Sequence, residues 1–177
     1  AFDTRNKNDL IGAQDPVTGE YPQSGERKVR GFELAAAGAI TANWQINAGI
    51  ASMKTEVVEG SATQTGAALQ YSPELTFTSW TSYTFPFGLR VGGGARYVDA
   101  TFRNGNATQA TVSNLAQSPD YWVLDFMAGY TVNESMSLQL NVQNLTDEFY
   151  FTSLNNGGSR YIPGTPRSAQ LTFNLKF

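Results

Sequence analysis

The sequence predicts an all-β fold, a transmembrane antiparallel β-barrel to which this chain contributes eight long strands. Three observations lead to this prediction: apolar residues alternate with polar ones, long and short connections alternate, and aromatic residues gather at two levels. Alternation at a period of two gives an extended chain one apolar face and one polar face. A strand of a membrane barrel needs this pattern, because one face meets lipid and the other faces the lumen.

The alternation and its interruptions divide the chain into eight expected strands. Most of them run for about thirteen to seventeen residues, whereas strands of soluble proteins average about five to six. Such lengths suit strands that cross a membrane, because the crossing alone takes about nine to eleven residues. The expected strands cover residues 1–11, 26–40, 44–58, 69–85, 89–102, 120–132, 136–151 and 164–177.

The connections between these strands are alternately long and short. The short ones, at residues 41–43, 86–88 and 133–135, consist of turn-forming residues. The long ones are polar and rich in Gly, Asn, Ser and Thr. Tight turns at one end and long loops at the other are typical of bacterial outer-membrane barrels. We therefore expect the short turns to face the periplasm and the long loops to face the exterior.

The two faces of the expected strands differ in polarity. The apolar face includes Phe32, Ile46, Val91, Leu124 and Leu140. The opposite face is polar and carries the charged residues Glu33, Arg90, Arg96 and Asp125. We expect these four side chains to point into the lumen, where a charged group needs a partner or water.

The fourth expected strand fits the alternation less well than the others. Ser79 and Thr81 fall on the same face as Phe77 and Tyr83, although that face should be apolar. The direction of Arg167 is also open. Strict alternation places it on the apolar face, near the outer end of the last strand, but a β-bulge there would turn it inward.

Aromatic residues form two groups along the strands. One group lies beside the short turns or the chain terminus and comprises Trp44, Phe85, Phe87, Tyr130 and Phe177. The other group, Phe32, Tyr97 and Trp122, lies about eight to ten residues away, which is close to the length of a membrane crossing. Two aromatic girdles are typical of the two membrane interfaces. A soluble β-sandwich with an aromatic core is the alternative, but its strands should be shorter.

Composition narrows the classes of function. A net charge of −3 and a pI of about 4.9 argue against a nucleic-acid partner. The chain contains no Cys and no His, which excludes thiolate and imidazole metal sites and disfavours catalysis. We therefore expect no enzyme activity and no metal site. A carboxylate Ca²⁺ site near Asp15 and Glu20, or near Asp147 and Glu148, is the alternative to solvated loop charge.

Three stretches resemble the C-terminal strands of TonB-dependent outer-membrane receptors. They are SGERKVRGFEL (24–34), NVQNLTDEFYF (141–151) and RYIPGTPRSAQLTFNLKF (160–177). GLRVGGGARYV (88–98) is also similar to that family. The stretches occur in the family's order over nearly the whole chain. Within the family, QSGERKVRGFEL and SLNNGGSRYIPGTPRS are most similar to the ferric-catecholate siderophore receptors.

The resemblance implies a 22-stranded barrel filled by an N-terminal plug. On this basis residues 1–177 supply eight strands, which form the C-terminal part of the barrel, and the plug domain is absent from this chain. The four charged residues of the polar face would then anchor the plug or wet its periphery. The apolar terminal strand resembles the signal that the barrel-assembly machinery reads. The residues that would carry this signal are Leu171, Phe173, Leu175 and Phe177.

The resemblance also implies active transport of a ferric siderophore, of the catecholate type, across the outer membrane. The siderophore is cargo, and no cofactor is expected. Energy would come from TonB, through the plug region, and the remaining partners would be outer-membrane lipid and lipopolysaccharide. Arginine and aromatic side chains suit a bulky, anionic, aromatic ligand. Candidate ligand contacts, each with loop packing as its alternative role, are Tyr21, Arg103, Tyr150, Phe151, Arg160 and Tyr161.

Two other functions remain open at this point. The chain could form a stand-alone eight-stranded barrel that acts as an adhesin or structural anchor. Its polar face, rich in Gly, Ala, Ser and Asn, would fill such a small lumen poorly. A TonB-dependent receptor for another cargo, such as cobalamin or a carbohydrate, fits these strands equally, because cargo choice depends on the loops and the plug.

Overall fold

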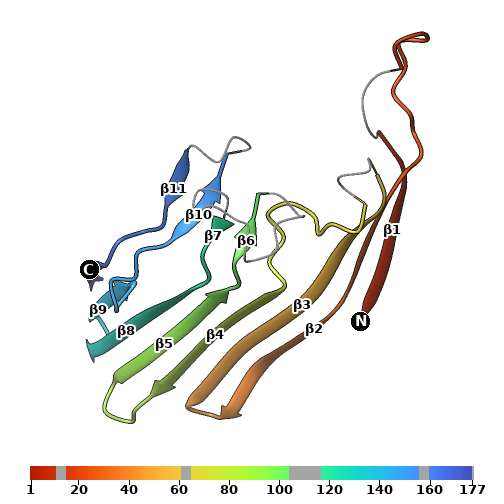
Figure 1. Ribbon diagram of the computed structural model, residues 1–177. Helices are drawn as coiled ribbons and strands as arrows, with labels where there is room; N and C mark the ends of the chain where they lie inside the picture. Colours follow the sequence, from red (N-terminus) through yellow and green to blue (C-terminus); the bar gives the residue numbers. More distant parts are fainter. Residues whose placement is uncertain (11–14, 61–64, 104–116, 156–159, 177) are drawn as a thin grey trace.

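A computed structural model describes residues 1–10, 15–60, 65–103, 117–155 and 160–176. Eight antiparallel strands form one continuous sheet, in which neighbours in sequence are neighbours in space (Figure 1). β1 and β12 lie at the two opposite edges of this sheet. The fold of the described residues is all-β, as the sequence predicts. Within them, no helix is both long enough and apolar enough to cross a membrane.

The sheet contains the long strands, and four short strands form two additional pairs. The strands of the main sheet are β1 (Phe2–Asp9), β2 (Gly25–Thr41), β3 (Trp44–Glu59), β4 (Leu75–Thr84), β5 (Leu89–Val98), β8 (Tyr121–Asn133), β9 (Met136–Gln143) and β12 (Ser168–Leu175). The short pairs are β6 (Thr101–Phe102) with β7 (Gln117–Ser118), and β10 (Phe151–Leu154) with β11 (Tyr161–Pro163).

The predicted short turns are confirmed, and the longer connections lie at the opposite end of the strands (Figure 1). In the first turn the Thr41 hydroxyl accepts the Trp44 N–H at 3.1 Å. In the second, Gly88 adopts a φ of 89°, a conformation that glycine reaches without strain. In the third, the Asn133 side-chain oxygen accepts the Ser135 N–H at 2.9 Å. Local polar contacts therefore reverse the chain where the sequence indicates.

The fourth strand begins at Leu75, and the predicted start at residue 69 is wrong. The preceding residues leave the ladder because Tyr71 adopts a positive φ of 54° and Pro73 has no N–H to donate. They pack instead along the outer end of β3. There the Leu69 N–H donates to the Thr55 hydroxyl at 2.9 Å.

Two other predicted strands are longer than the observed ones. The strand predicted over 89–102 is divided between β5 and β6, where the Asp99 carboxylate accepts the Ala100 N–H at 2.8 Å. The strand predicted over 136–151 ends at Gln143, because Asn144 adopts a positive φ of 49° and redirects the chain.

The connection predicted as a loop over residues 152–163 contains most of the β10–β11 hairpin. The last strand of the main sheet then begins at Ser168, after the proline-containing stretch PGTP of residues 163–166. Prolines cannot donate to a ladder, so this stretch separates β11 from β12. Residue 11, predicted as the end of the first strand, and Phe177 lie outside the described residues.

The strand register brings apolar residues into one continuous row across the sheet. Leu34 lies opposite Ile50, Ile50 opposite Phe77, Phe77 opposite Tyr97, and Tyr97 opposite Trp122. The Trp122 ring is 5.9 Å from that of Phe77 and 4.9 Å from that of Tyr97. Cross-strand aromatic pairs of this kind stabilise a sheet. The row belongs to the aromatic level that the sequence places away from the short turns.

A second aromatic cluster lies beside the short turn between β4 and β5. The Phe85 ring is 4.8 Å from the Tyr83 ring and 5.3 Å from the Phe87 ring. Nearby, the Trp44 indole N–H donates to the Thr81 hydroxyl at 2.8 Å. This bond explains why the fourth strand departs from the apolar pattern, since the hydroxyl accepts from a tryptophan on the same face.

Candidate functional site

The polar face of the sheet carries an ordered set of side chains beside the short-turn end. The Arg90 guanidinium donates to the Ser82 hydroxyl at 3.0 Å and to the Gln45 side-chain oxygen at 3.4 Å. Ser82 is only 4% exposed. The partners come from β3 and β4, the two strands before the one that carries Arg90. The charge of Arg90 is therefore solvated by polar groups of the same chain.

A tryptophan covers the next part of this face. A Cβ atom built on Gly94 would lie 2.6 Å from the Trp80 ring, and one built on Gly92 would lie 3.3 Å from it. The indole therefore rests on the two glycines, which share the polar face with Arg90 by alternation. The sequence GGG in β5 serves as a flat surface for this ring, and the small residues make room within the barrel wall.

A third group lies where the polar face meets the long connections. The Arg96 guanidinium donates to the Tyr150 hydroxyl at 3.2 Å and lies 5.9 Å from the centre of its ring. The Tyr150 ring stacks on the Tyr121 ring, with 4.4 Å between centroids, and is 5% exposed. Any side chain on Gly164 would overlap the Tyr150 ring. β5, β8 and the chain after β11 therefore converge on one tyrosine.

Asn144 joins this group to the chain that follows β9. Its side-chain amide donates to the carbonyl oxygens of Glu148 at 2.8 Å and Thr165 at 3.0 Å, and its oxygen accepts the Glu148 N–H at 2.8 Å. Its own N–H donates to the Asp125 carboxylate at 2.9 Å. Asn144 is 1% exposed. One buried amide thus fixes the turn after β9 and the stretch before β12 against each other.

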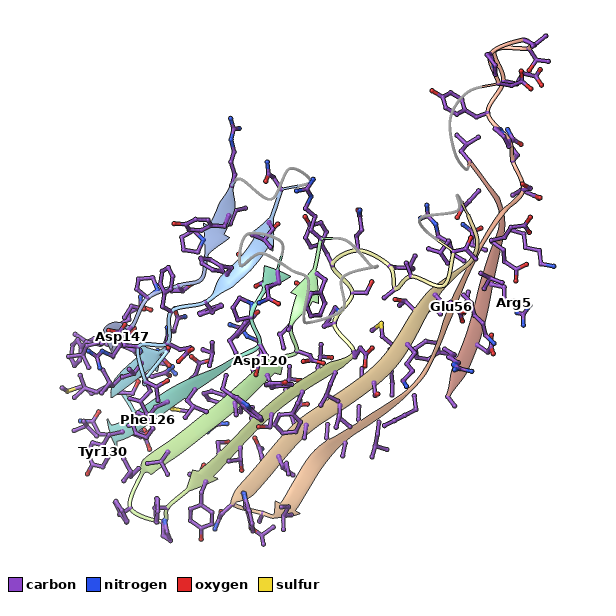
Figure 2. All side chains as sticks on the ribbon, viewed as in Figure 1. Arg5, Glu56, Asp120, Phe126, Tyr130 and Asp147 are labelled. Atoms are coloured by element: carbon purple, nitrogen blue, oxygen red, sulfur yellow. The ribbon has the colours of Figure 1, made fainter. Side chains whose placement is uncertain are left out.

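Arg167 pairs with Asp147 just before β12, outside the strand to which strict alternation applies. The Arg167 N–H donates to Asp147 Oδ1 at 3.0 Å, and its guanidinium lies 3.7 Å from Oδ2. Both side chains are more than half exposed. Figure 2 shows Asp147 near the edge of the sheet that ends in β9 and β12.

Aromatic side chains also gather on the β10–β11 hairpin. The Phe151 ring is 5.2 Å from the Phe149 ring and 4.5 Å from the Tyr161 ring. Phe149 is 72% exposed and Tyr161 is 57% exposed. The Tyr71 hydroxyl donates to the Asn155 carbonyl at 2.8 Å, so the connection before β4 braces this hairpin. An accessible aromatic surface therefore projects from a supported element.

The candidate ligand contacts fall into three sets by exposure. Tyr150 is buried and accepts a hydrogen bond from Arg96, whereas Tyr21, Arg160 and Tyr161 are exposed. Phe151 and Arg103 are partly exposed. Among these candidates, the structure brings Phe151, Arg160 and Tyr161 together on one hairpin.

The four charged residues assigned to the polar face differ in their surroundings. Arg90, Arg96 and Asp125 have hydrogen-bond partners within the chain. Glu33 is exposed on β2. In the terminal strand Leu171, Phe173 and Leu175 are 70%, 53% and 45% exposed.

Two of the four acidic residues considered for Ca²⁺, Asp15 and Asp147, have hydrogen-bond partners within the chain. The Asp15 carboxylate accepts the N–H groups of Val17 at 2.7 Å and Thr18 at 3.1 Å, and these bonds lower the pKa of Asp15 below its ordinary value. Asp147 binds Arg167. Among the described residues, no three acidic side chains come close enough together to hold a metal ion.

Sequence reasoning missed three residues that organise this face: Trp80, Tyr121 and Asn144. Asn144 offered a signal, since it belongs to the NLTDEFY stretch, and asparagine tolerates positive φ better than other residues with a side chain. Trp80 also offered a signal, because alternation places it on the polar face, away from the apolar residues of its strand. Nothing local marks Tyr121, because its partner Tyr150 is distant in the sequence.

Comparison with known proteins gives a consistent result. The profile of the family described as TonB dependent receptor-like, beta-barrel matches residues 1–145. The catecholate siderophore receptor Fiu of Escherichia coli (strain K12) is 38% identical over 161 residues, 90% of this chain and 21% of that protein. The probable TonB-dependent siderophore receptor PiuA of Acinetobacter baumannii is 35% identical over 188 residues, 99% of this chain and 24% of that protein.

Solved structures agree with the sequence comparisons. The closed form of Escherichia coli Fiu superposes with a TM-score of 0.84 and 37% identity, over 99% of this chain and 24% of that one. The Pseudomonas aeruginosa ferripyoverdine receptor, at 22% identity and a TM-score of 0.77, shares the fold. The chain thus spans between 21% and 24% of the length of Fiu and PiuA.

Long antiparallel strands with one apolar and one polar face, tight turns at one end and two aromatic levels define a β-barrel membrane protein. Within that class, the chain belongs to the TonB-dependent receptor family, in its β-barrel domain.

Proposed function

We propose that this chain forms part of an outer-membrane receptor that imports a ferric siderophore of the catecholate type, with energy supplied through TonB. The similarity to Fiu, which is named a catecholate siderophore receptor, carries the proposal, because it extends over 90% of the chain at 38% identity. In this proposal the chain is the C-terminal part of a 22-stranded barrel, and a plug domain completes the receptor. The relatives are receptors, so we propose no catalytic step.

The β10–β11 hairpin is the proposed ligand contact of this chain. Arg160 supplies a positive charge for an anionic complex, and Tyr161 and Phe151 supply aromatic faces that stack on catechol rings. Tyr150 is assigned a positioning role instead, because it is buried against Tyr121 and bound to Arg96. Tyr21 and Arg103 are proposed as further contacts from neighbouring connections.

A binding titration of the intact polypeptide, extracted from outer membranes into detergent, tests the cargo. The three ligands are a ferric tris-catecholate, a ferric trihydroxamate and cobalamin, with quenching of tryptophan fluorescence as the readout. We expect binding of the tris-catecholate at concentrations where the other two show none. Preferential binding of either of the other ligands would replace the proposed cargo with a hydroxamate or with cobalamin.

A substitution tests whether the ligand binds at the β10–β11 hairpin. Arg160→Gln should weaken tris-catecholate binding about tenfold, since a hydrogen bond to a charged group contributes about 1.5–3 kcal/mol. Lys176→Gln is the matched control, because it removes one positive charge next to the short turn between β8 and β9. Equal affinities for the two variants would remove the hairpin from the site and leave the cargo assignment standing.

The second candidate is a stand-alone eight-stranded barrel. Because β1 and β12 lie at opposite edges of the described sheet, the full receptor is favoured over self-closure. The intact mass of the polypeptide extracted from outer membranes separates the two. A mass several times 19.2 kDa supports the receptor, and a mass near 19.2 kDa contradicts it.

Assembly and membrane partners complete the proposal. The barrel-assembly machinery would read the terminal strand, in which Leu171, Phe173 and Leu175 share the face opposite the polar one. Leu171 lies across from Leu140, and Phe173 lies across from Leu138, so these side chains extend the apolar face to the edge of the sheet. Outer-membrane lipid and lipopolysaccharide would cover this face.

A further inference from the structure

The outer half of β2 and β3 carries charged residues on the apolar side of the sheet. Toward the short turn, this face of the two strands holds uncharged residues only, namely Phe32, Leu34, Ala36, Gly38, Ile40, Trp44, Ile46, Ala48, Ile50 and Ser52. The next residues on the same face are Arg30 and Lys54. They lie about ten residues along the strand from the short turn, where a membrane crossing ends.

Arg30 and Lys54 are directly opposite each other in the register, and both are exposed. Like charges in this position destabilise a sheet, because the two side chains project from neighbouring points on one face. A sequence selected only for stability would place an acid at one of the two positions. The pairing is therefore a local conflict that calls for a functional reason.

Two acids neighbour this pair on the same face, and neither forms an ion pair with Arg30 or Lys54. One is Glu56, which lies opposite Lys28 and two residues from Lys54. Asp3 lies opposite Arg30 on β1, but its carboxylate binds the Lys28 ammonium group at 3.1 Å. Farther from the membrane, Arg5 and Lys7 both contact Glu26, at 3.0 and 4.0 Å. The other cations of this face thus have acidic partners, whereas the two that border the apolar surface form no ion pair within the described residues.

A groove between the strands joins these cations to the apolar face. It is lined by Arg30 and Lys54, by Phe32 and Ser52 on the membrane side, and also by Phe2, Asp3, Gly31 and Met53. Phe32 is 50% exposed. The groove therefore presents two positive charges above an aromatic ring, which is the arrangement that complements a phosphate attached to acyl chains.

Next to the aromatic row of β5 and β8, the charged residues are acidic. Asp99 directly follows β5, Asp120 directly precedes β8, and Tyr97 donates to Asp99 at 3.3 Å. Figure 2 shows Asp120 in the middle of the molecule and Arg5 and Glu56 on the β1–β3 side. Arg30 and Lys54 are therefore not part of a belt of cations that continues past Asp99 and Asp120.

We propose that Arg30 and Lys54 form a binding site for the phosphate groups of lipopolysaccharide in the outer leaflet, with an acyl chain against Phe32. The Arg30 guanidinium and the Lys54 ammonium group bind the phosphate from neighbouring strands, and the anion relieves their mutual repulsion. This inference rests on the outer-membrane location in the proposed function, but it is independent of the cargo. It gives the receptor a fixed lipid on the wall formed by β2 and β3.

Native mass spectrometry of the intact polypeptide in detergent tests the site, with bisphosphorylated lipid A as the probe. The double variant Arg30→Gln/Lys54→Gln should bind lipid A about 10- to 30-fold more weakly, since each cation near an anionic lipid surface contributes about 1 kcal/mol. The matched control is Arg5→Gln/Lys7→Gln, which removes two charges from the same face. It should keep nearly the original affinity, because those cations are paired with Glu26.

The exchange variant Arg30→Lys/Lys54→Arg keeps both charges and should keep binding, which separates lost charge from lost folding. Dephosphorylated lipid A should bind the unmodified protein as weakly as bisphosphorylated lipid A binds the double glutamine variant. Equal affinities of the glutamine variant and the unmodified protein, or equal losses in both double variants, would overturn the site. Failure of the unmodified protein to bind a ferric catecholate would overturn the proposed cargo and leave this site standing.

Discussion

At the scale of single residues, the Asn144 side chain joins the turn after β9 to the stretch before β12. It combines a positive φ with three side-chain hydrogen bonds and almost complete burial. A buried amide is stable only when its donors and acceptor are satisfied, and here backbone groups satisfy them. Asn144 is therefore the residue on which the shape of the chain between β9 and β12 depends.

Asn144→Ala should loosen this segment strongly. The substitution removes three hydrogen bonds and leaves the carbonyl groups of Glu148 and Thr165 without this donor, a loss of about 2–4 kcal/mol in local stability. Hydrogen-exchange mass spectrometry should show amide exchange in residues 144–154 accelerated about 30-fold or more. Asn174→Ala, which removes an exposed side chain from β12, is the control. Unchanged exchange in the Asn144 variant would show that the turn is held by its backbone alone.

Asp15 provides a second residue-scale prediction, which concerns pH. Its pKa is lowered by the N–H groups of Val17 and Thr18, so the charged form stabilises the turn. A group whose folded pKa is lowered contributes above its unfolded pKa and loses that contribution as the pH falls through the folded value. We expect the Val17 and Thr18 amides to exchange faster below about pH 4 than the general pH trend predicts. Asp15→Ala should abolish this acid-dependent step, and a step that persists would assign it to another group.

At the scale of strands, the contact between β4 and β5 depends on the absence of side chains. Trp80 lies flat on Gly92 and Gly94, and the backbone carbonyl of Ser79 is also close to Gly94. Both strands gain apolar contact on a face that is otherwise polar. Glycine within a strand normally weakens it. Here the two glycines are required because the Trp80 ring packs against them in the folded sheet.

Gly94→Ala should destabilise the barrel by about 1–3 kcal/mol, because the new methyl group would force the indole and the neighbouring strand apart. Gly38→Ala is the matched control, since a Cβ at that position on β2 meets nothing within 4 Å. Thermal unfolding of the two variants in the same detergent measures the difference. We expect the Gly94 variant to unfold at the lower temperature. Equal unfolding temperatures would mean that Trp80 moves aside without cost.

At the scale of the whole molecule, the sheet has two unlike ends. The short turns lie at one end, and the long connections, the β6–β7 pair and the β10–β11 hairpin lie at the other (Figure 1). Aromatic residues mark both levels, through Tyr83, Phe85 and Phe87 near the turns and through Tyr97 and Trp122 farther away. From this polarity we propose that the short turns face the periplasm and the long connections face the exterior.

Introduced cysteines test this orientation, because the chain contains none of its own. Val17→Cys lies in the connection between β1 and β2, where Val17 is 91% exposed, and should react with a membrane-impermeant maleimide on intact cells. Glu134→Cys lies in the short turn after β8 and should react only after the outer membrane is permeabilised. The reverse pattern of labelling would invert the proposed topology.

The sequence by itself determined the class of fold, the three short turns, the apolar and polar faces and the family resemblance. These follow from local physics, since side chains alternate along every strand and turn residues act on their nearest neighbours. It did not determine where β4 begins or where β9 ends, because Tyr71 and Asn144 leave the ladder for partners at Phe102, Asn155 and Thr165.

Tertiary structure alone decided which candidate residues stand together. Tyr150 became a buried support for Arg96, and Arg160 and Tyr161 became the accessible part of the β10–β11 hairpin. The facing positions of Arg30 and Lys54 are likewise a product of strand register. The physical reason is that such contacts join residues far apart in the sequence, and their distances are set by pairing and packing rather than by local preference.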